Sequence, residues 1–182
     1  MLRFYLGSVV GIFTFVSPVL GASLDNVVTA SDSTRVKVEA NAETGTRKFM
    51  APVIRFTARG RTDGYAIVSR TVEGGVMGQI EVSGLVRYPD KLRKYDHAKF
   101  SDGQLARFRA VRDDKVCEGE DCIFTEQFKL SITPEQLAFY ADSYDKVPLL
   151  VASTHSEQSF IVYVPVNHFA AVLEVSSHSL TV

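Results

Sequence analysis

The sequence contains no tryptophan, only two cysteines and no excess of charge of either sign. Its 182 residues include 20 Lys and Arg against 21 Asp and Glu, which gives a formal net charge of -1. Without a basic surplus, there is no electrostatic reason to expect nucleic acid as a partner. Hydrophobic residues make up 46% of the chain and charged residues 23%, which excludes a disordered or fibrous protein and predicts a packed core.

Familiar catalytic motifs are also missing. The sequence has no Gly-x-Ser-x-Gly elbow, no His-Glu-x-x-His helix, no phosphate-binding loop and no dinucleotide-binding fingerprint. Its four histidines are scattered, so no metal-ligand spacing emerges. Thr154, His155 and Ser156 place hydroxyls on both sides of a histidine, but a solvated turn explains them more simply. We therefore assign no catalytic residue, metal or cofactor.

The first 22 residues have the order of a secretory signal peptide. Arg3 is the only charged residue before Asp25, an apolar run extends from Phe4 to Val16, and Pro18 precedes the small residues 21–23. The alternative is an anchor helix, but the run is shorter than the ~20 residues that a bilayer requires. We expect residues 1–22 to be removed, leaving a periplasmic or secreted protein with no transmembrane segment in the mature chain.

Export changes how the two cysteines are interpreted. Cys117 and Cys122 have four residues between them, in a chain expected to enter an oxidising compartment, and this favours a structural disulfide. The acidic neighbours Glu118, Glu120 and Asp121 would oppose a reactive thiolate. A redox role, or free thiols with or without a metal, are the alternatives.

Strand patterns dominate the remaining chain. We expect a loose N-terminal lead-in over 23–46, with a short strand at 35–39, followed by a single β-rich domain over 47–182. The stretch 76–88 shows the clearest alternation of apolar and polar residues, after a Gly74-Gly75 turn. Further strands are expected at 50–57, 65–72, 104–116, 122–131, 148–153 and 159–164.

Two helices are expected in the C-terminal half. Thr133 is a good N-cap, Pro134 suits the first helical position, and Gln136 can bond back to the cap. Asn167 is expected to cap a last helix. The combined pattern predicts a mainly β fold of the α+β class, an antiparallel sandwich-like domain with two short helices.

The cysteine hairpin allows a prediction of its register. Pairing Cys117 with Cys122 would place Asp113 opposite Glu126, two like charges, whereas a shift by one residue places Arg112 opposite Glu126. A β-bulge between the cysteines and Glu126 would reconcile the two registers. We therefore expect an Arg112–Glu126 ion pair on the inner face. The alternative is that Glu126 points to solvent beside an irregular strand.

Charge is distributed unevenly in the same region. Residues 87–112 include eight basic and three acidic residues, and residues 113–126 include six acidic and one basic. Lys91, Arg93 and Lys94 therefore form a possible anion-binding strip, for an anionic envelope component or another protein. The alternative is an ordinary solvated surface.

These features carry a resemblance. Arg112, the Cys-x4-Cys pair, the Glu126-x-Phe128-x-Leu130 strand, the following helix and Val164-Pro165 resemble uncharacterised secreted or lipoprotein-type β-rich proteins of the bacterial envelope. The hairpin and helix are also similar to the periplasmic invasion-associated locus B family, although that family's further cysteines are missing here. Neither resemblance implies an enzymatic activity or carries catalytic residues across.

Three functions remain open at this point. We expect first an exported envelope protein with a non-enzymatic binding or structural role, stabilised by its hairpin disulfide. The second is an accessory subunit of a secretion, adhesion or virulence system, acting through protein contacts. The third is a small hydrolase or carbohydrate-active enzyme, which a pocket with convergent His, Asp or Glu would favour.

Overall fold

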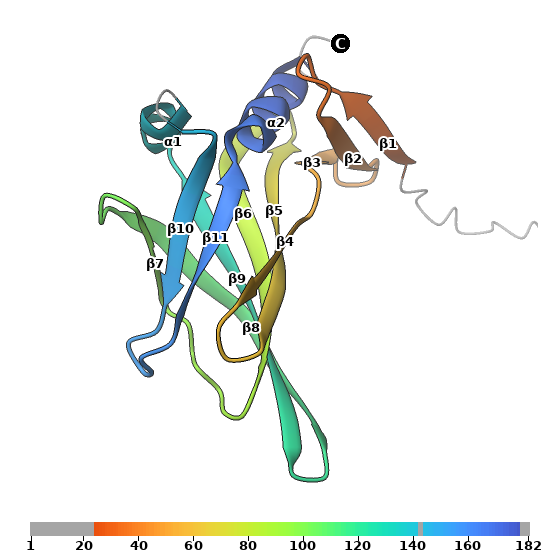
Figure 1. The fold of residues 1–182 in the computed structure, drawn as a ribbon. Helices are drawn as coiled ribbons and strands as arrows, with labels where there is room; N and C mark the ends of the chain where they lie inside the picture. The colour runs from red at the N-terminus through yellow and green to blue at the C-terminus, as the bar shows by residue number, and fades with distance from the viewer. Residues whose placement is uncertain (1–23, 142–143, 179–182) are drawn as a thin grey trace, which may run out of the picture.

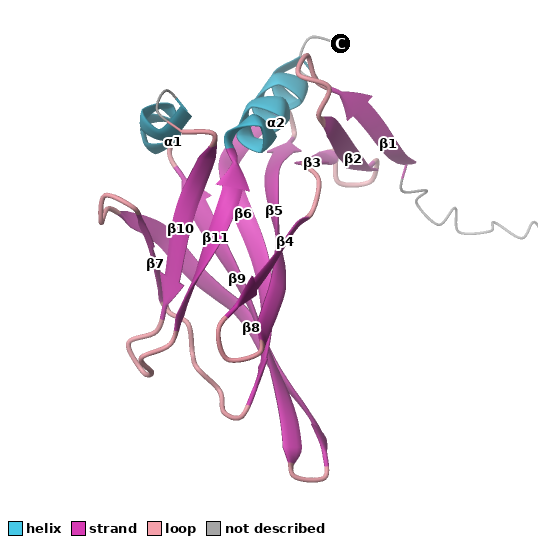
Figure 2. Ribbon diagram, in the orientation of Figure 1, coloured by secondary structure: helices cyan, strands magenta, loops and turns pink. Residues whose placement is uncertain are grey.

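The computed structural model describes residues 24–141 and 144–178, so the expected leader lies outside the described residues. The described part is mainly antiparallel β-sheet with two helices, as the sequence predicts (Figures 1 and 2). The strands are β1 Leu24–Thr29, β2 Arg35–Asn41, β3 Thr46–Met50, β4 Ile54–Ala58, β5 Thr62–Glu73, β6 Val76–Pro89, β7 His97–Phe100, β8 Leu105–Glu118, β9 Asp121–Ile132, β10 Lys146–Ala152 and β11 Ser159–Pro165. The helices are α1 Pro134–Ala141 and α2 Val166–His178.

The strands form one sheet that curls until its two parts face each other. Its order is β1-β2-β3-β5-β6-β9-β8-β7-β10-β11, and β4 pairs with the first half of β5. Aromatic rings meet between the facing parts, with the Phe160 ring centroid on β11 5.2 Å from Phe56 on β4 and 6.0 Å from Phe128 on β9. This curvature gives the sandwich-like arrangement and a closed core.

The alternation in β6 builds the centre of that core. Val82, Val86 and Tyr88 are buried and face the core beside Phe128 and Leu130 of β9. Val76, the first residue of the alternating stretch 76–88, is 72% exposed because it follows the Gly74-Gly75 turn at the sheet margin. The period of two therefore holds except at the end next to the turn.

The structure of the N-terminal residues differs from the loose lead-in expected over 23–46. Residues 24–41 are not a loose lead-in, because they form β1 and β2, which pair with each other and extend the sheet through β3. The short strand expected at 35–39 is confirmed within β2, whose Val36 and Val38 are buried. The polar composition of this region agrees with its exposure, since residues 26–29 of β1 are all exposed, whereas β2 has buried side chains.

Proline divides a second expected strand in two. One strand is expected at 50–57, but β3 ends at Met50 and β4 begins at Ile54, on either side of Pro52. Proline lacks the N–H that a sheet ladder needs. After the break, the chain pairs with a different half of β5.

Both helices lie at the same end of the curled sheet (Figure 1). The α1 capping box is confirmed, since the Thr133 N–H donates to Gln136 Oε1 at 3.1 Å and the Gln136 N–H donates to Thr133 Oγ1 at 3.2 Å. Asn167 does not cap α2, because it lies inside its first turn and donates to Thr34 Oγ1 at 3.1 Å. Within the described residues, neither helix is long and apolar enough to cross a membrane.

Candidate functional site

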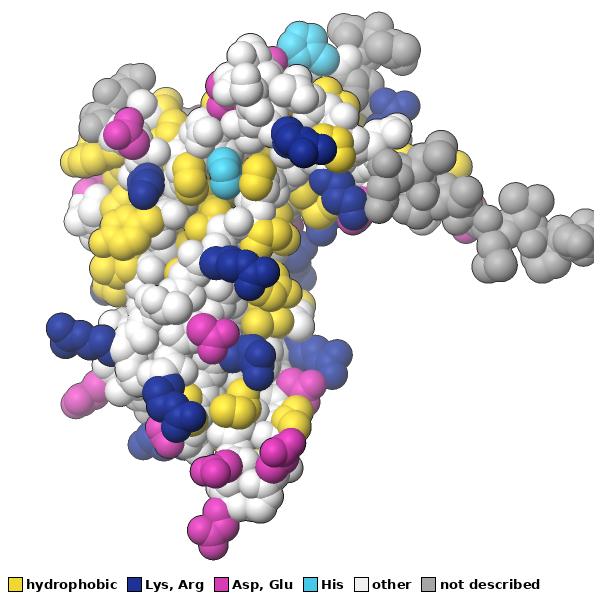
Figure 3. Space-filling view, turned by 45° about the vertical axis from the view of Figure 1, so that its right-hand side comes forward, with side chains coloured by type: hydrophobic (Ala, Val, Ile, Leu, Met, Phe, Trp, Pro, Cys, Tyr) yellow, Lys and Arg dark blue, Asp and Glu magenta, His cyan; other side chains and the backbone are white. Residues whose placement is uncertain are grey.

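The cysteine hairpin is the part of the sheet that projects from the body (Figure 1). Cys117 and Cys122 lie directly opposite each other in β8 and β9 and form the expected disulfide. Side chains of β8 from Arg109 to Glu118 are all exposed. Acidic side chains gather at this end of the molecule (Figure 3). The disulfide therefore pins a solvated, acidic arm.

The expected β-bulge exists, but it lies on the other side of Glu126. The register shifts between Ala110 and Arg112, so Asp113 lies opposite Glu126 and Arg112 lies opposite Gln127. The expected Arg112–Glu126 ion pair is therefore wrong. Arg112 is exposed and its guanidinium lies 3.3 Å from the Asp114 carboxylate instead. Two opposed acids are tolerated because Asp113 is solvated while Glu126 turns inward.

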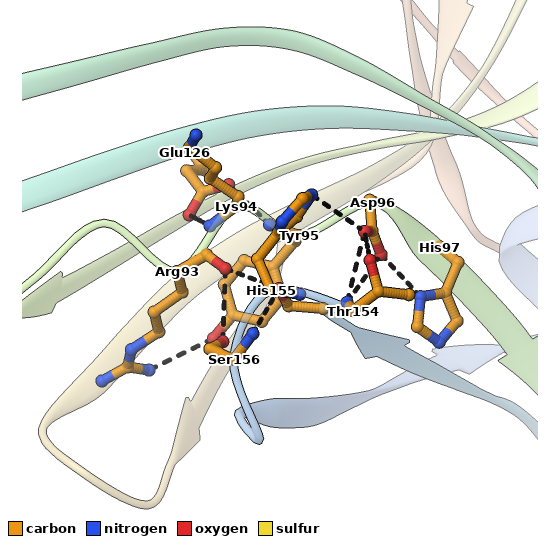
Figure 4. Close-up of polar contacts among 10 residues, drawn as sticks. Arg93, Lys94, Tyr95, Asp96, His97, Glu126, Thr154, His155 and Ser156 are labelled. Atoms are coloured by element: carbon orange, nitrogen blue, oxygen red, sulfur yellow. Dashed lines mark hydrogen bonds and ion pairs between the residues drawn. The ribbon is translucent and has the colours of Figure 1, made fainter.

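Glu126 is 7% exposed and accepts hydrogen bonds from a loop (Figure 4). The backbone N–H of Lys94 donates to its Oε1 at 3.0 Å, and that of Tyr95 donates to its Oε2 at 2.8 Å. The Tyr88 hydroxyl also donates to Oε1. Burial and the hydrogen bond to Glu126 raise the pKa of Tyr88, so this hydroxyl stays protonated as a donor. Three donors thus satisfy the inward-facing carboxylate without a cation.

The burial of Arg93 contradicts the expectation that Lys91, Arg93 and Lys94 form one surface strip. Lys91 and Lys94 are exposed, but Arg93 is only 6% exposed and its guanidinium stacks 4.1 Å from the centre of the Tyr88 ring. Its Nη1 donates to Thr62 Oγ1 at 2.6 Å and to the Tyr95 hydroxyl at 3.2 Å. Arg93 therefore anchors the loop from inside and contributes no surface charge to a strip.

Asp96 fastens the same loop to the β10–β11 turn (Figure 4). It accepts hydrogen bonds from the Thr154 hydroxyl and backbone N–H, and His97 Nδ1 lies 2.6 Å from Oδ1. The Thr154 and His97 contacts lower the pKa of Asp96 to about 2. The Ser156 hydroxyl donates to the Arg93 carbonyl at 3.2 Å, while His155 Nε2 lies 3.7 Å from Asp96. The Thr154 and Ser156 hydroxyls and His155 therefore hold the β10–β11 turn against the loop that contains Arg93 and Asp96.

A cavity of about 630 Å³ opens between the two helices and the ends of β5, β6 and β9. Its inner wall contains the buried side chains of Ile80, Ile132, Leu137 and Phe169. Arg70 of β5 also lines it. Such a volume and apolar lining are typical of sites for small molecules. No group of three His, Cys, Asp or Glu side chains in the described chain is placed to hold a metal ion.

The cavity was not anticipated from the sequence, because its walls come from three parts of the chain that are far apart, within 70–80, 132–141 and 166–173. The available signal was Arg70 itself, a cation within the apolar strand 65–72. A charged side chain in a buried apolar strand needs a polar partner or access to solvent. The residues that were singled out instead, Lys91, Arg93, Lys94, Arg112 and Glu126, all lie outside the cavity wall.

No protein-family model, curated protein or solved structure matches this chain.

Proposed function

We propose that this chain is an exported protein of the bacterial envelope with a non-enzymatic role, binding an apolar small molecule in the cavity between α1 and α2. The apolar cavity of about 630 Å³ is the observation that supports the proposal, because a ligand that buries its apolar surface there gains binding free energy. The Cys117–Cys122 disulfide and the order of the first 22 residues support export. The disulfide pins the acidic arm outside this cavity.

Binding is tested with a neutral, apolar fluorescent probe, N-phenyl-1-naphthylamine, added to the purified protein. We expect saturable enhancement of its emission. Ala170→Phe places a large ring at the cavity wall and should abolish the enhancement. Ser177→Phe, an exposed position on the same helix outside that wall, is the matched control and should keep it. Equal binding by both variants, or none by the unmodified protein, contradicts the proposed site.

Export is tested in the native cell by fractionation and by thiol labelling with a maleimide polymer. We expect the protein in the envelope fraction, shortened by its leader, with both thiols labelled only after reduction. Full-length protein in the cytosol, with Cys117 and Cys122 labelled before reduction, contradicts the proposal.

A second candidate is an accessory subunit of a secretion, adhesion or virulence system, and it is favoured by the edge of the sheet. Among the described residues, β11 has a hydrogen-bonded neighbour only in β10, and its Ile161 and Tyr163 are exposed. Such an edge can pair with a strand of another protein. A photo-crosslinking residue at Tyr163 should form an adduct with one envelope protein in cells, and the same residue at exposed Lys91 should not. The absence of an adduct at Tyr163 contradicts this candidate.

A further inference from the structure

Arg70 is a fixed cation in the wall of the apolar cavity. Its Nε donates to the Gly78 carbonyl at 2.9 Å, and its Nη1 donates to the Ser176 hydroxyl at 3.4 Å. These contacts join β5 to β6 and α2, so they set the position of the guanidinium. They arise at an irregularity in the β5–β6 pairing, where the register shifts between Arg70 and Val72.

No acidic side chain of the described residues neutralises the guanidinium charge. Across the described residues, no carboxylate lies within ion-pair distance of Arg70, and its Nη2 makes no hydrogen bond. A guanidinium is planar and presents several donors, which suits a carboxylate better than a neutral group. The half-buried position of Arg70 reduces screening by water, so an anion gains more there than at an exposed arginine.

Glu135 is the other charged residue in the cavity lining. It is exposed in the first turn of α1, where its own backbone N–H and then the Thr133 hydroxyl lower its pKa. Its charge is therefore satisfied by the helix start rather than by Arg70. The interior between the two charged residues is formed by apolar side chains, including Ile132, Leu137 and Phe169.

We propose that the cavity binds a long-chain carboxylate, with the alkyl chain between α1 and α2 and the carboxylate against Arg70. This inference rests on the proposed function and names its ligand class. Each buried methylene should raise the affinity about fourfold. The carboxylate should add a further factor of about ten through a charge-assisted contact with the guanidinium.

The test is displacement of N-phenyl-1-naphthylamine from the purified full chain by three twelve-carbon ligands below their micelle concentrations. Dodecanoate should displace the probe at about tenfold lower concentration than dodecan-1-ol, and dodecyltrimethylammonium should be the weakest. This comparison needs no variant, so it is independent of any folding defect. Equal potency of acid and alcohol, or strongest displacement by the ammonium, overturns the carboxylate assignment.

Variants then locate the head group. Arg70→Gln should reduce the dodecanoate affinity about tenfold and leave that of dodecan-1-ol unchanged, while Arg70→Lys should retain a preference for the acid. Glu135→Gln is the matched control and should not reduce dodecanoate affinity. If Arg70→Gln binds dodecanoate as well as the unmodified protein does, the carboxylate assignment is overturned. If that variant still binds the probe, the proposed function, an apolar binding cavity, is retained. Failure of the unmodified protein to bind the probe or dodecanoate overturns both.

Discussion

Gly84 on β6 lies directly opposite Phe128 on β9, and the Phe128 ring fills the space that a Cβ atom at Gly84 would take. Both residues face the core, where Phe128 also contacts Phe108 and Phe160. The glycine is therefore required by the close approach of a ring, and its φ is not in the left-handed region.

Gly84→Ala should destabilise the protein by about 1–3 kcal/mol, because the added methyl forces the Phe128 ring out of its packed position. Urea unfolding followed by circular dichroism measures this loss. Ser83→Ala, whose side chain points to the other face of β6, should change the free energy of unfolding by less than about 0.5 kcal/mol. Equal effects of the two substitutions would contradict the close contact.

Glu126→Gln should cost about 2–3 kcal/mol, because the amide NH₂ would face a site where three donors converge. Asp113→Asn, at the exposed position opposite in β8, is the matched control and should be almost neutral. Hydrogen exchange should also show faster exchange of the Lys94 and Tyr95 amides in Glu126→Gln. Unchanged protection of these amides would show that another group holds the loop.

Asp96 makes stability depend on pH in a defined window. Its folded-state pKa of about 2 lies below the ordinary aspartate value, so its contribution is complete above about pH 4 and is lost as the pH falls towards 2. Asp96→Asn should cost about 1 kcal/mol at pH 7, since the carboxylate is 32% exposed and partly screened. The difference from the unmodified protein should shrink below pH 4 and vanish near pH 2.

Urea unfolding at several pH values checks this dependence. Asp63→Asn, which removes an exposed carboxylate from β5, should show a much smaller difference at pH 7. A difference for Asp96→Asn that stays constant down to pH 2 would rule out the ionised carboxylate as the stabilising group.

Replacing both Cys117 and Cys122 by Ser should lower the free energy of unfolding by at most about 2 kcal/mol, because the closed loop is very short. The arm is solvated, so the structural effect should be local. Amide exchange should accelerate at Val116 and Ile123, while Leu130 in the core keeps its protection. Loss of protection at Leu130 would show that the disulfide supports the whole sheet.

The sequence predicted the features that depend on neighbouring residues. The capping box at Thr133 and Gln136 needs only a spacing of three, and the alternation in β6 needs only a period of two. The presence of a bulge in the cysteine hairpin could also be predicted, because Phe108 and Ala110 match Leu130 and Phe128 only in a shifted register, but its expected position was wrong.

The features that were missed depend on backbone groups and on distant segments. Arg112 was assigned to Glu126 by charge, yet the partners of Glu126 are backbone N–H groups of Lys94 and Tyr95, which no side-chain pattern reveals. Arg93 was counted as surface charge because Lys91 and Lys94 lie close to it in the sequence. Its burial depends on the Tyr88 ring and on Thr62, about thirty residues away.

Strand β9 connects the two ends of the molecule without interruption. It begins beside the disulfide, with Cys122 as its second residue, and ends at Ile132 in the cavity wall. Its twelve residues span roughly 36–40 Å at the rise of an antiparallel strand. A protein bound to the arm and a molecule bound in the cavity would therefore be separated by the length of β9. The two could bind at the same time, and any coupling between the two binding events would have to pass along β9.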